Sequence, residues 1–199
     1  MARTLLVGDV HGCATSLARL LDKARADEVI LLGDLLAKGP DPRGTWDIIR
    51  DIGARSVMGN HDWRLLQVWG TPGDSAHHVA SRLLPDEARE WLAGLPLFLH
   101  GDGWVAVHAG LHPFDWVAGT SRSMATTLRR WPDDKNLENP FWWQLYEGDT
   151  RVYYGHDAMR GVQHHPRTVG LDSGAVYGGL LTGIVREEDT LVQVEGWIR

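Results

Sequence analysis

The chain has 199 residues, of which 43% are hydrophobic and 23% are charged. These values are ordinary for a globular protein and argue against a disordered or fibrous chain. A chain of this length can bury one substantial core, so we predict a single domain over residues 1–199. The formal net charge of −6 argues against broad nucleic-acid binding, which usually needs a basic face.

Cysteine content and the N-terminal sequence indicate the compartment. The single cysteine, Cys13, cannot form a disulfide within the chain, and the N-terminal segment lacks the basic and apolar regions of a signal peptide. No apolar run approaches the roughly 20 residues that a membrane-spanning helix needs. We therefore expect a cytoplasmic protein with no membrane partner.

The first third of the chain is predicted to form three consecutive βα units. Short apolar runs ending in a polar, glycine-flanked turn are each followed by apolar residues at helical spacing. Such units imply right-handed crossovers and a mainly parallel sheet. We predict strands near 3–8, 29–32 and 56–58, and helices near 17–24, 43–52 and from 63 to 69.

The rest of the chain is predicted to be richer in strands. A helix near 85–94 precedes a strand pair over 96–108, and residues 111–150 have the composition of a cap or lid with one helix near 121–130. Four more short apolar runs with glycines between them predict strands near 151–155, 167–171, 180–186 and 190–195.

Metal-binding residue types occur where five of these strands end. Ligands in open α/β sheets gather at the carboxyl ends of strands, so side chains from several strand ends can converge on one edge. Apart from His61, the histidines outside the candidate set are not expected to bind metal, namely His77, His78, His100, His112, His164 and His165. The candidate ligands are Asp9, His11, Asp34, Asn60, His108 and His156.

A mixture of imidazole and oxygen ligands suits divalent metals of intermediate hardness. We expect two ions, with Mn²⁺ first and Fe²⁺, Zn²⁺ or Co²⁺ as alternatives. Two such ions a few ångströms apart can share a carboxylate and hold a bridging hydroxide for attack at phosphorus. Asp34 is our choice for the shared carboxylate. The sequence therefore predicts a two-metal phosphoesterase.

The candidate ligands lie in ordered motifs, namely Gly8-Asp9-Val10-His11-Gly12, Gly33-Asp34 to Gly39, Gly59-Asn60-His61-Asp62, and the later His108 and His156. These motifs resemble those of the calcineurin-like metallophosphoesterases and, within them, the phosphoprotein phosphatase superfamily. The run 38–41, the Asp62 that ends the third motif and the segment 170–174 look most like its diadenosine tetraphosphatase type. The resemblance spans nearly the whole chain and implies a four-layer α/β/β/α sandwich.

The resemblance also implies roles for individual residues. Asp9, His11 and Asp34 would bind one metal, whereas Asp34, Asn60, His108 and His156 would bind the other. His61 would protonate the leaving oxygen, a role that suits imidazole near neutral pH. Asp62 would either orient His61 or cap the helix that follows, and the sequence leaves both roles open.

Two positions depart from the protein phosphatases of this superfamily. Lys38 stands where most relatives have an arginine, so the site keeps a positive charge but loses the planar guanidinium fork. Ala37 replaces an aspartate that pairs with the catalytic histidine. The supporting contact to His61 must therefore be absent or replaced.

The substrate-binding residues are predicted to be Asn60, Lys38 and a second cation. Arg129 fits this second position best, with Arg122, Arg130 and Arg151 as alternatives. Trp142 or Trp143 could stack on a nucleobase.

The favoured activity is hydrolysis of phosphoanhydrides in dinucleoside polyphosphates, such as diadenosine tetraphosphate. The alternatives are a Ser/Thr or Tyr protein phosphatase acting on phosphoproteins, or a broad phosphatase acting on polyphosphate or capped nucleotides. A binding module without turnover is a further alternative, but it would typically have lost at least one of these ligands.

Overall fold

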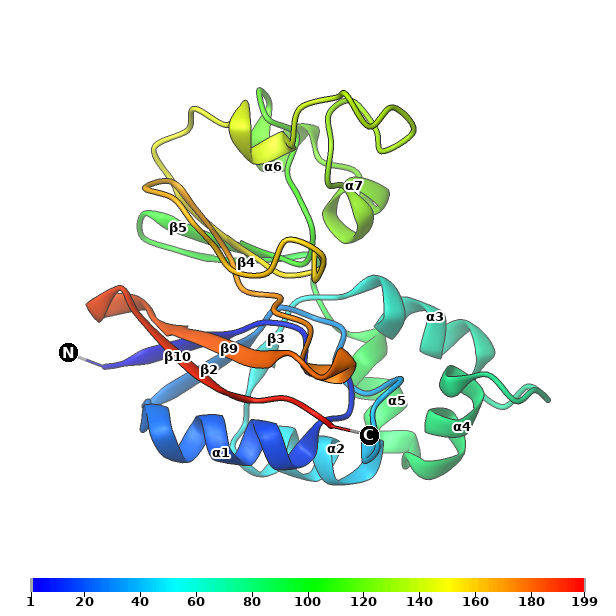
Figure 1. Cartoon of the computed structure of the whole chain (residues 1–199). Helices are drawn as coiled ribbons and strands as arrows, with labels where there is room; N and C mark the ends of the chain where they lie inside the picture. Colours follow the sequence, from blue (N-terminus) through cyan, green and yellow to red (C-terminus); the bar gives the residue numbers. More distant parts are fainter. Residues whose placement is uncertain (1, 199) are drawn as a thin grey trace.

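The predicted apolar runs form the strands of two mixed sheets that face one another (Figure 1). The computed structural model describes residues 2–198. In the first sheet, the strands follow the order β10-β9-β1-β2-β3, and β1, β2 and β3 are parallel. The strands of this sheet are β1 (Thr4–Val7), β2 (Glu28–Leu31), β3 (Arg55–Ser56), β9 (Leu180–Val185) and β10 (Thr190–Glu195).

The second sheet also contains three parallel strands. Its order is β4-β5-β6-β8-β7, in which β5, β6 and β8 are parallel and the edge strands β4 and β7 are antiparallel to their neighbours. The strands of this sheet are β4 (Phe98–Gly101), β5 (Trp104–Val107), β6 (Arg151–Tyr154), β7 (Gln163–His164) and β8 (Thr168–Gly170).

Helices cover the outer faces of both sheets, which confirms the expected α/β/β/α layers (Figure 1). In that view, α1 and α2 lie beneath the first sheet, α6 and α7 lie above the second, and α3, α4 and α5 form a group at one side. The helices are α1 (Ala14–Ala24), α2 (Pro42–Asp51), α3 (Asn60–Val68), α4 (Ala76–Leu83), α5 (Asp86–Ala93), α6 (Trp116–Gly119) and α7 (Arg122–Thr127).

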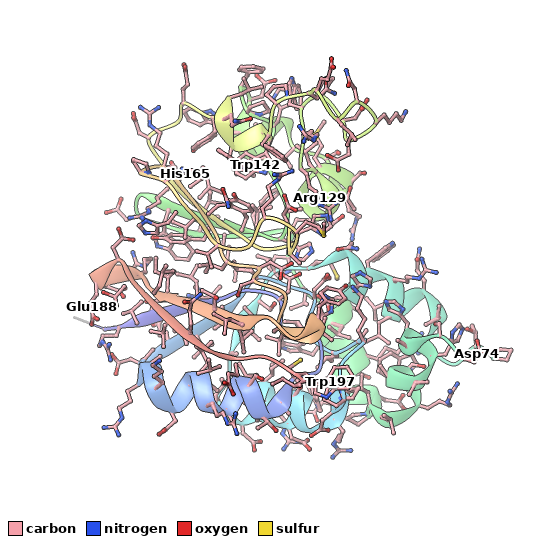
Figure 2. The ribbon with its side chains drawn as sticks, viewed as in Figure 1. Asp74, Arg129, Trp142, His165, Glu188 and Trp197 are labelled. Atoms are coloured by element: carbon pink, nitrogen blue, oxygen red, sulfur yellow. The ribbon has the colours of Figure 1, made fainter. Side chains whose placement is uncertain are left out.

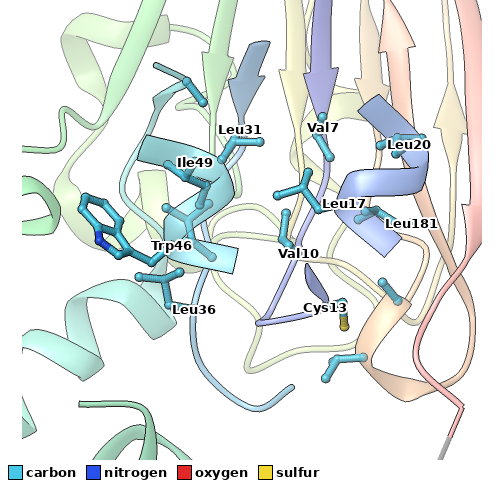
Figure 3. Packing of buried hydrophobic residues seen from close by; sticks show 14 of the residues in the cluster. Val7, Val10, Cys13, Leu17, Leu20, Leu31, Leu36, Trp46, Ile49 and Leu181 are labelled. Atoms are coloured by element: carbon cyan, nitrogen blue, oxygen red, sulfur yellow. The ribbon is translucent and has the colours of Figure 1, made fainter. Parts of the chain in front are cut away.

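Three apolar clusters hold the four layers together. One lies beneath the first sheet, where Leu17 and Leu20 of α1 and Trp46 of α2 pack against strand residues such as Leu31 (Figure 3). A second, which includes Leu6, joins the two sheets. Burial of this apolar surface is the main stabilising contribution to the arrangement.

The third cluster attaches the 111–150 segment to the outer face of the second sheet. Leu111, Leu128 and Trp142 pack there against β5 and β6. The Trp142 indole Nε1 donates a hydrogen bond of 3.1 Å to the backbone oxygen of Ala109. The buried residues of the 111–150 segment therefore attach it to the second sheet.

Two helices were not predicted from the sequence, and one is shorter than expected. The inner face of α4 consists of His77, Ala80 and Ser81, so the helix lacks the large apolar residues that reveal helical spacing. The four-residue α6 is too short to give a pattern, and α7 ends at Thr127 rather than near residue 130. Within residues 2–198, no helix is long and apolar enough to cross a membrane.

Candidate metal centre

The six predicted ligands come together because their strand ends do. β1 delivers Asp9 and His11, β2 delivers Asp34 and β3 delivers Asn60. From the facing sheet, β5 delivers His108 and β6 delivers His156. The carboxyl ends of parallel strands meet at one edge of a sheet. Face-to-face packing of two such sheets therefore places both edges around one site.

The first group of ligands contains two carboxylates and one imidazole. The Nε2 atom of His11 lies 3.5 Å from Oδ2 of Asp34 and 3.9 Å from Oδ2 of Asp9. All three side chains are buried. Their ligand atoms lie within 4.8 Å of one another, which is close enough for one cation to contact all three.

The second group lies on the other side of Asp34. Oδ1 of Asp34 is 3.6 Å from Nε2 of His108, and Oδ1 of Asn60 lies 3.0 Å from that nitrogen and 3.1 Å from Nδ1 of His156. Asp34 thus directs one oxygen toward each group. This is the geometry that a shared carboxylate requires.

The protonation of His108 explains why this second group calls for a cation. Its Nδ1 lies 2.6 Å from the backbone oxygen of Leu32, which can only accept, so Nδ1 carries the proton. Burial lowers the pKa of His108, so the ring is neutral and Nε2 presents a lone pair. That lone pair faces the acceptor oxygens of Asn60 and Asp34. A metal ion would satisfy all three atoms, and the bond to Leu32 would fix the ring as in many metal sites.

The buried carboxylates of the site also favour a bound cation. Burial raises the pKa of Asp9, and the neighbouring Asp172 and Asp34 raise it further. Burial also raises the pKa of Asp34, to about 7, and that of Asp172. Three carboxyl groups in one buried cluster are unfavourable as anions unless positive charge lies among them. The residues present therefore fit divalent cations.

Close backbone contacts hold the ligands in place. A Cβ at Gly59 would overlap the backbone nitrogen and Oδ1 of Asp34, and a Cβ at Gly155 would overlap Oδ1 of Asp9. Only glycine permits these approaches. Several non-glycine site residues also have the uncommon positive φ that clusters at functional sites, namely His11 (49°), Asp34 (55°), Lys38 (78°) and His156 (69°).

Asp62 connects the second and third motifs through backbone hydrogen bonds. Its buried carboxylate accepts bonds from the backbone nitrogens of Asp34 (2.7 Å), Leu35 (2.9 Å) and Gly59 (3.0 Å). The bond from Gly59 caps the start of α3. The sequence left Asp62 either orienting His61 or capping the helix, and these contacts favour the helix cap. The bonds from Asp34 and Leu35 also hold the loop that carries Asp34.

His61 meets a residue that the sequence did not single out. Its Nδ1 lies 2.8 Å from Nε2 of His77 in α4. Burial and, to a smaller extent, the nearby charge of Lys38 together lower the pKa of His61 to about 3. His61 lines the same cavity as the candidate ligands.

Two positively charged side chains, Lys38 and Arg129, line this cavity, which has a volume of about 570 Å³. Lys38 Nζ lies 3.4 Å from Nε2 of His11 and donates a 3.0 Å hydrogen bond to the Tyr177 hydroxyl. Arg129 follows α7 and lines the cavity, where its guanidinium donates to the backbone oxygen of His156 at 3.3 Å. Figure 2 shows Arg129 on the side of the upper layers that faces the first sheet.

The three alternatives to Arg129 contact groups that do not line the cavity. Arg122 lies over the Trp63 ring, Arg130 lies over the Phe141 ring, and Arg151 pairs with Asp189. Among the described residues, only Arg129 of these four arginines lines the cavity.

The expectation that Trp142 could stack on a nucleobase is wrong. Trp142 is fully buried in the third cluster, because its indole fills the space between β5, β6 and the 111–150 segment. Trp143 stacks between Phe141 and His165, with centroid distances of 5.5 and 4.5 Å. Figure 2 shows Trp142 and His165 in the upper layers, away from the lower sheet.

Two residues of the site were missed. Asp172 follows β8 as His108 follows β5 and His156 follows β6, so a sixth strand end supplies a buried carboxylate. Its position after a short apolar run was the available signal. His77 lies in the unpredicted helix α4, and nothing in its local sequence indicates that it faces His61.

The chain is similar in sequence to known phosphoesterases. Residues 2–179 match the family of calcineurin-like phosphoesterases. A protein from Aromatoleum aromaticum named symmetrical bis(5'-nucleosyl)-tetraphosphatase is 26% identical over 260 residues, covering 94% of this chain and 95% of the relative. A protein of the same name from Thioalkalivibrio sulfidiphilus is 37% identical over 147 residues, covering 66% of this chain and 54% of the relative.

Solved structures agree with this assignment. One described as a candidate diadenosine tetraphosphatase has a TM-score of 0.91 and 32% identity, covering all of this chain and 95% of that chain. A metallophosphoesterase from Sphaerobacter thermophilus shares the fold, with a TM-score of 0.64 and 19% identity over all of this chain and 89% of that chain. The chain therefore belongs to the calcineurin-like phosphoesterase family.

Proposed function

We propose that the protein hydrolyses a phosphoanhydride bond of dinucleoside polyphosphates in the cytoplasm, with diadenosine tetraphosphate as the first candidate. The observation that carries this proposal is the single cavity that joins both ligand groups, two cations and an exposed aromatic ring. A simple phosphate would occupy only part of this volume. The names of the relatives support the same substrate class.

The polyphosphate would lie between Lys38 and Arg129. These cations border the candidate metal ligands, and a guanidinium can bind two phosphate oxygens at once. Asn60 directs Oδ1 toward His108 and His156, which leaves its amide nitrogen to donate to phosphate. Together, these groups would hold one phosphoryl group in a fixed orientation.

Divalent metals would be held by Asp9, His11 and Asp34 on one side, and by Asp34, Asn60, His108 and His156 on the other. When bound, such ions supply Lewis-acid activation of phosphorus and of the attacking water. The donor set favours Mn²⁺, with Fe²⁺, Zn²⁺ or Co²⁺ as alternatives.

His61 would act as the general acid. As the P–O bond breaks, the Nε2 proton of its imidazolium moves to the departing phosphate oxygen. Burial is the main cause of the lowered pKa of His61, and the charge of Lys38 is the next. The bound anion would offset the contribution of Lys38 and so favour the protonated ring in the substrate complex. Asp62 supports the site through the backbone and does not transfer a proton.

A nucleobase would bind at the cavity mouth against Tyr177. Its ring is 67% exposed although it lines the cavity, and its hydroxyl bonds to Lys38. Met159, which is 95% exposed, lines the same cavity. An exposed aromatic face next to a phosphate-binding cation suits a base joined to phosphate. This location replaces the earlier suggestion of Trp142.

The test is product analysis with Mn²⁺-loaded protein. Diadenosine tetraphosphate, polyphosphate, a capped dinucleotide and a phosphopeptide are compared for the wild type, His61→Asn and the distant control His164→Asn. We expect preference for the dinucleotide and adenosine diphosphate as its sole product. On added phenyl phosphate, whose leaving group is basic, His61→Asn alone should lose about 100-fold or more. Faster turnover of phosphopeptide or polyphosphate would reject the substrate, and equal rates for His61→Asn would reject the acid.

A further inference from the structure

The imidazoles of His61 and His77 lie edge to edge. Their planes differ by 9°, their centroids are 5.0 Å apart and the two facing nitrogens are 2.8 Å apart. Two ring radii plus the hydrogen bond account for the centroid distance, so the rings are nearly coplanar. The lone pair of an imidazole nitrogen lies in the ring plane. The contact therefore has the geometry of a strong, directional hydrogen bond.

His77 lies where it can hold the ring of His61 in one orientation. It is buried on the inner face of α4, whereas His61 is half-buried on α3, and the two helices pack against one another. Ala37, which stands where the protein phosphatases carry an aspartate, is buried and presents only a methyl group. In the part of the chain that the structure describes, the His61 ring forms its hydrogen bond with the ring of His77.

We propose that His77 is the positioning residue for His61, fixing its ring so that Nε2 carries the proton given to the leaving oxygen. The inference rests on the proposed acid role of His61. In the acid form, Nδ1–H of His61 donates to the lone pair on Nε2 of His77, while the His77 proton is on Nδ1. When the P–O bond breaks, the Nε2 proton of His61 moves to the departing oxygen. His61 is then neutral, with its remaining proton still bonded to His77.

Three variants separate this role from a general effect on folding. His77→Phe keeps a planar ring but removes the accepting nitrogen, whereas His77→Gln keeps a polar group close to the position of Nε2. His78→Phe is the matched control, because His78 is adjacent in α4 but bonds to Ser75 through a 2.7 Å contact. Metal content and circular dichroism are measured for each protein.

The decisive readout is the dependence of the rate on the leaving group. A general acid matters for a basic leaving group and little for an acidic one. For His77→Phe, we expect kcat to fall about 10- to 100-fold on phenyl phosphate but less than about threefold on 4-nitrophenyl phosphate, with partial recovery in His77→Gln. Equal losses on both esters, or the same loss in His78→Phe, would overturn the proposal.

A double mutant tests whether His77 acts through His61. In the His61→Asn background, His77→Phe should have no further effect on phenyl phosphate, because coupled residues are not additive. A full additional loss would show that His77 acts by another route and would overturn the proposal.

A measurement without substrate separates this inference from the proposed function. In protein loaded with diamagnetic Zn²⁺ and labelled with ¹⁵N-histidine, the hydrogen bond predicts a nitrogen–nitrogen scalar coupling between the two rings that is lost in His77→Phe. Absence of this coupling in the wild type would overturn the inference. A protein that cleaves aryl phosphates and shows the coupling, but leaves dinucleotides intact, would reject the proposed substrate and retain the role of His77.

Discussion

The carboxylate of Asp62 accepts a 2.7 Å hydrogen bond from the backbone nitrogen of Asp34, 28 residues earlier in the chain. Asp34 is the residue that directs one oxygen toward each ligand group. The loop that carries the shared carboxylate is therefore held from the start of α3.

Asp62→Asn should destabilise the protein by about 2 kcal/mol, because an amide has one acceptor oxygen for three backbone donors and leaves at least one buried N–H unsatisfied. Urea denaturation of the metal-free protein measures this loss. Asp41→Asn is the control, since Asp41 caps α2 through one exposed contact and asparagine caps equally well. Equal free energies of unfolding for Asp62→Asn and the wild type would show that these hydrogen bonds do not stabilise the loop.

The shared position of Asp34 predicts an asymmetry in metal binding. The wild type should bind about two equivalents of Mn²⁺, His11→Ala should retain about one, and Asp34→Asn should retain well under one. The reason is that Asp34 belongs to both ligand groups and His11 to one. Elemental analysis after dialysis gives the stoichiometry. Identical stoichiometry for the two variants would show that Asp34 does not bridge.

Arg129 and its neighbour Arg130 should differ in their effect on catalysis. Arg129→Ala should raise KM for the dinucleotide about tenfold, and Arg129→Lys should recover only part of this loss because lysine lacks the bidentate fork. Arg130→Ala should leave KM unchanged, since its guanidinium lies over Phe141. Steady-state kinetics measure KM for both variants. An equal rise in KM for Arg130→Ala would show that the effect comes from loss of surface charge and not from a phosphate contact of Arg129.

Gly59→Ala should prevent metal binding, whereas Gly53→Ala should not. A methyl group at position 59 overlaps the backbone and carboxylate of Asp34 and must displace the shared ligand. At Gly53, φ is +62° and no atom lies within 4 Å, so alanine costs only about 1 kcal/mol of backbone strain. Mn²⁺ titration calorimetry with urea denaturation separates these effects. Unchanged Mn²⁺ affinity in Gly59→Ala would disprove the need for this close approach.

The sequence by itself determined the parts of the protein whose chemistry is local. Asp9, Asp34 and His108 could be located because apolar runs, glycines and polar residues recur in a fixed order along the chain. The same patterns predicted the three parallel strands of the first sheet, since burial on both faces leaves a continuous apolar run.

The tertiary structure decided which side chains meet across the layers. The bond between His61 and His77 joins two helices, the buried Asp172 comes from the facing sheet, and the buried Trp142 is set by packing of the 111–150 segment. None of these relations has a local sequence period, because each depends on how separate elements pack. Residue order therefore specified the candidate metal ligands, whereas packing specified the partner of the proposed acid.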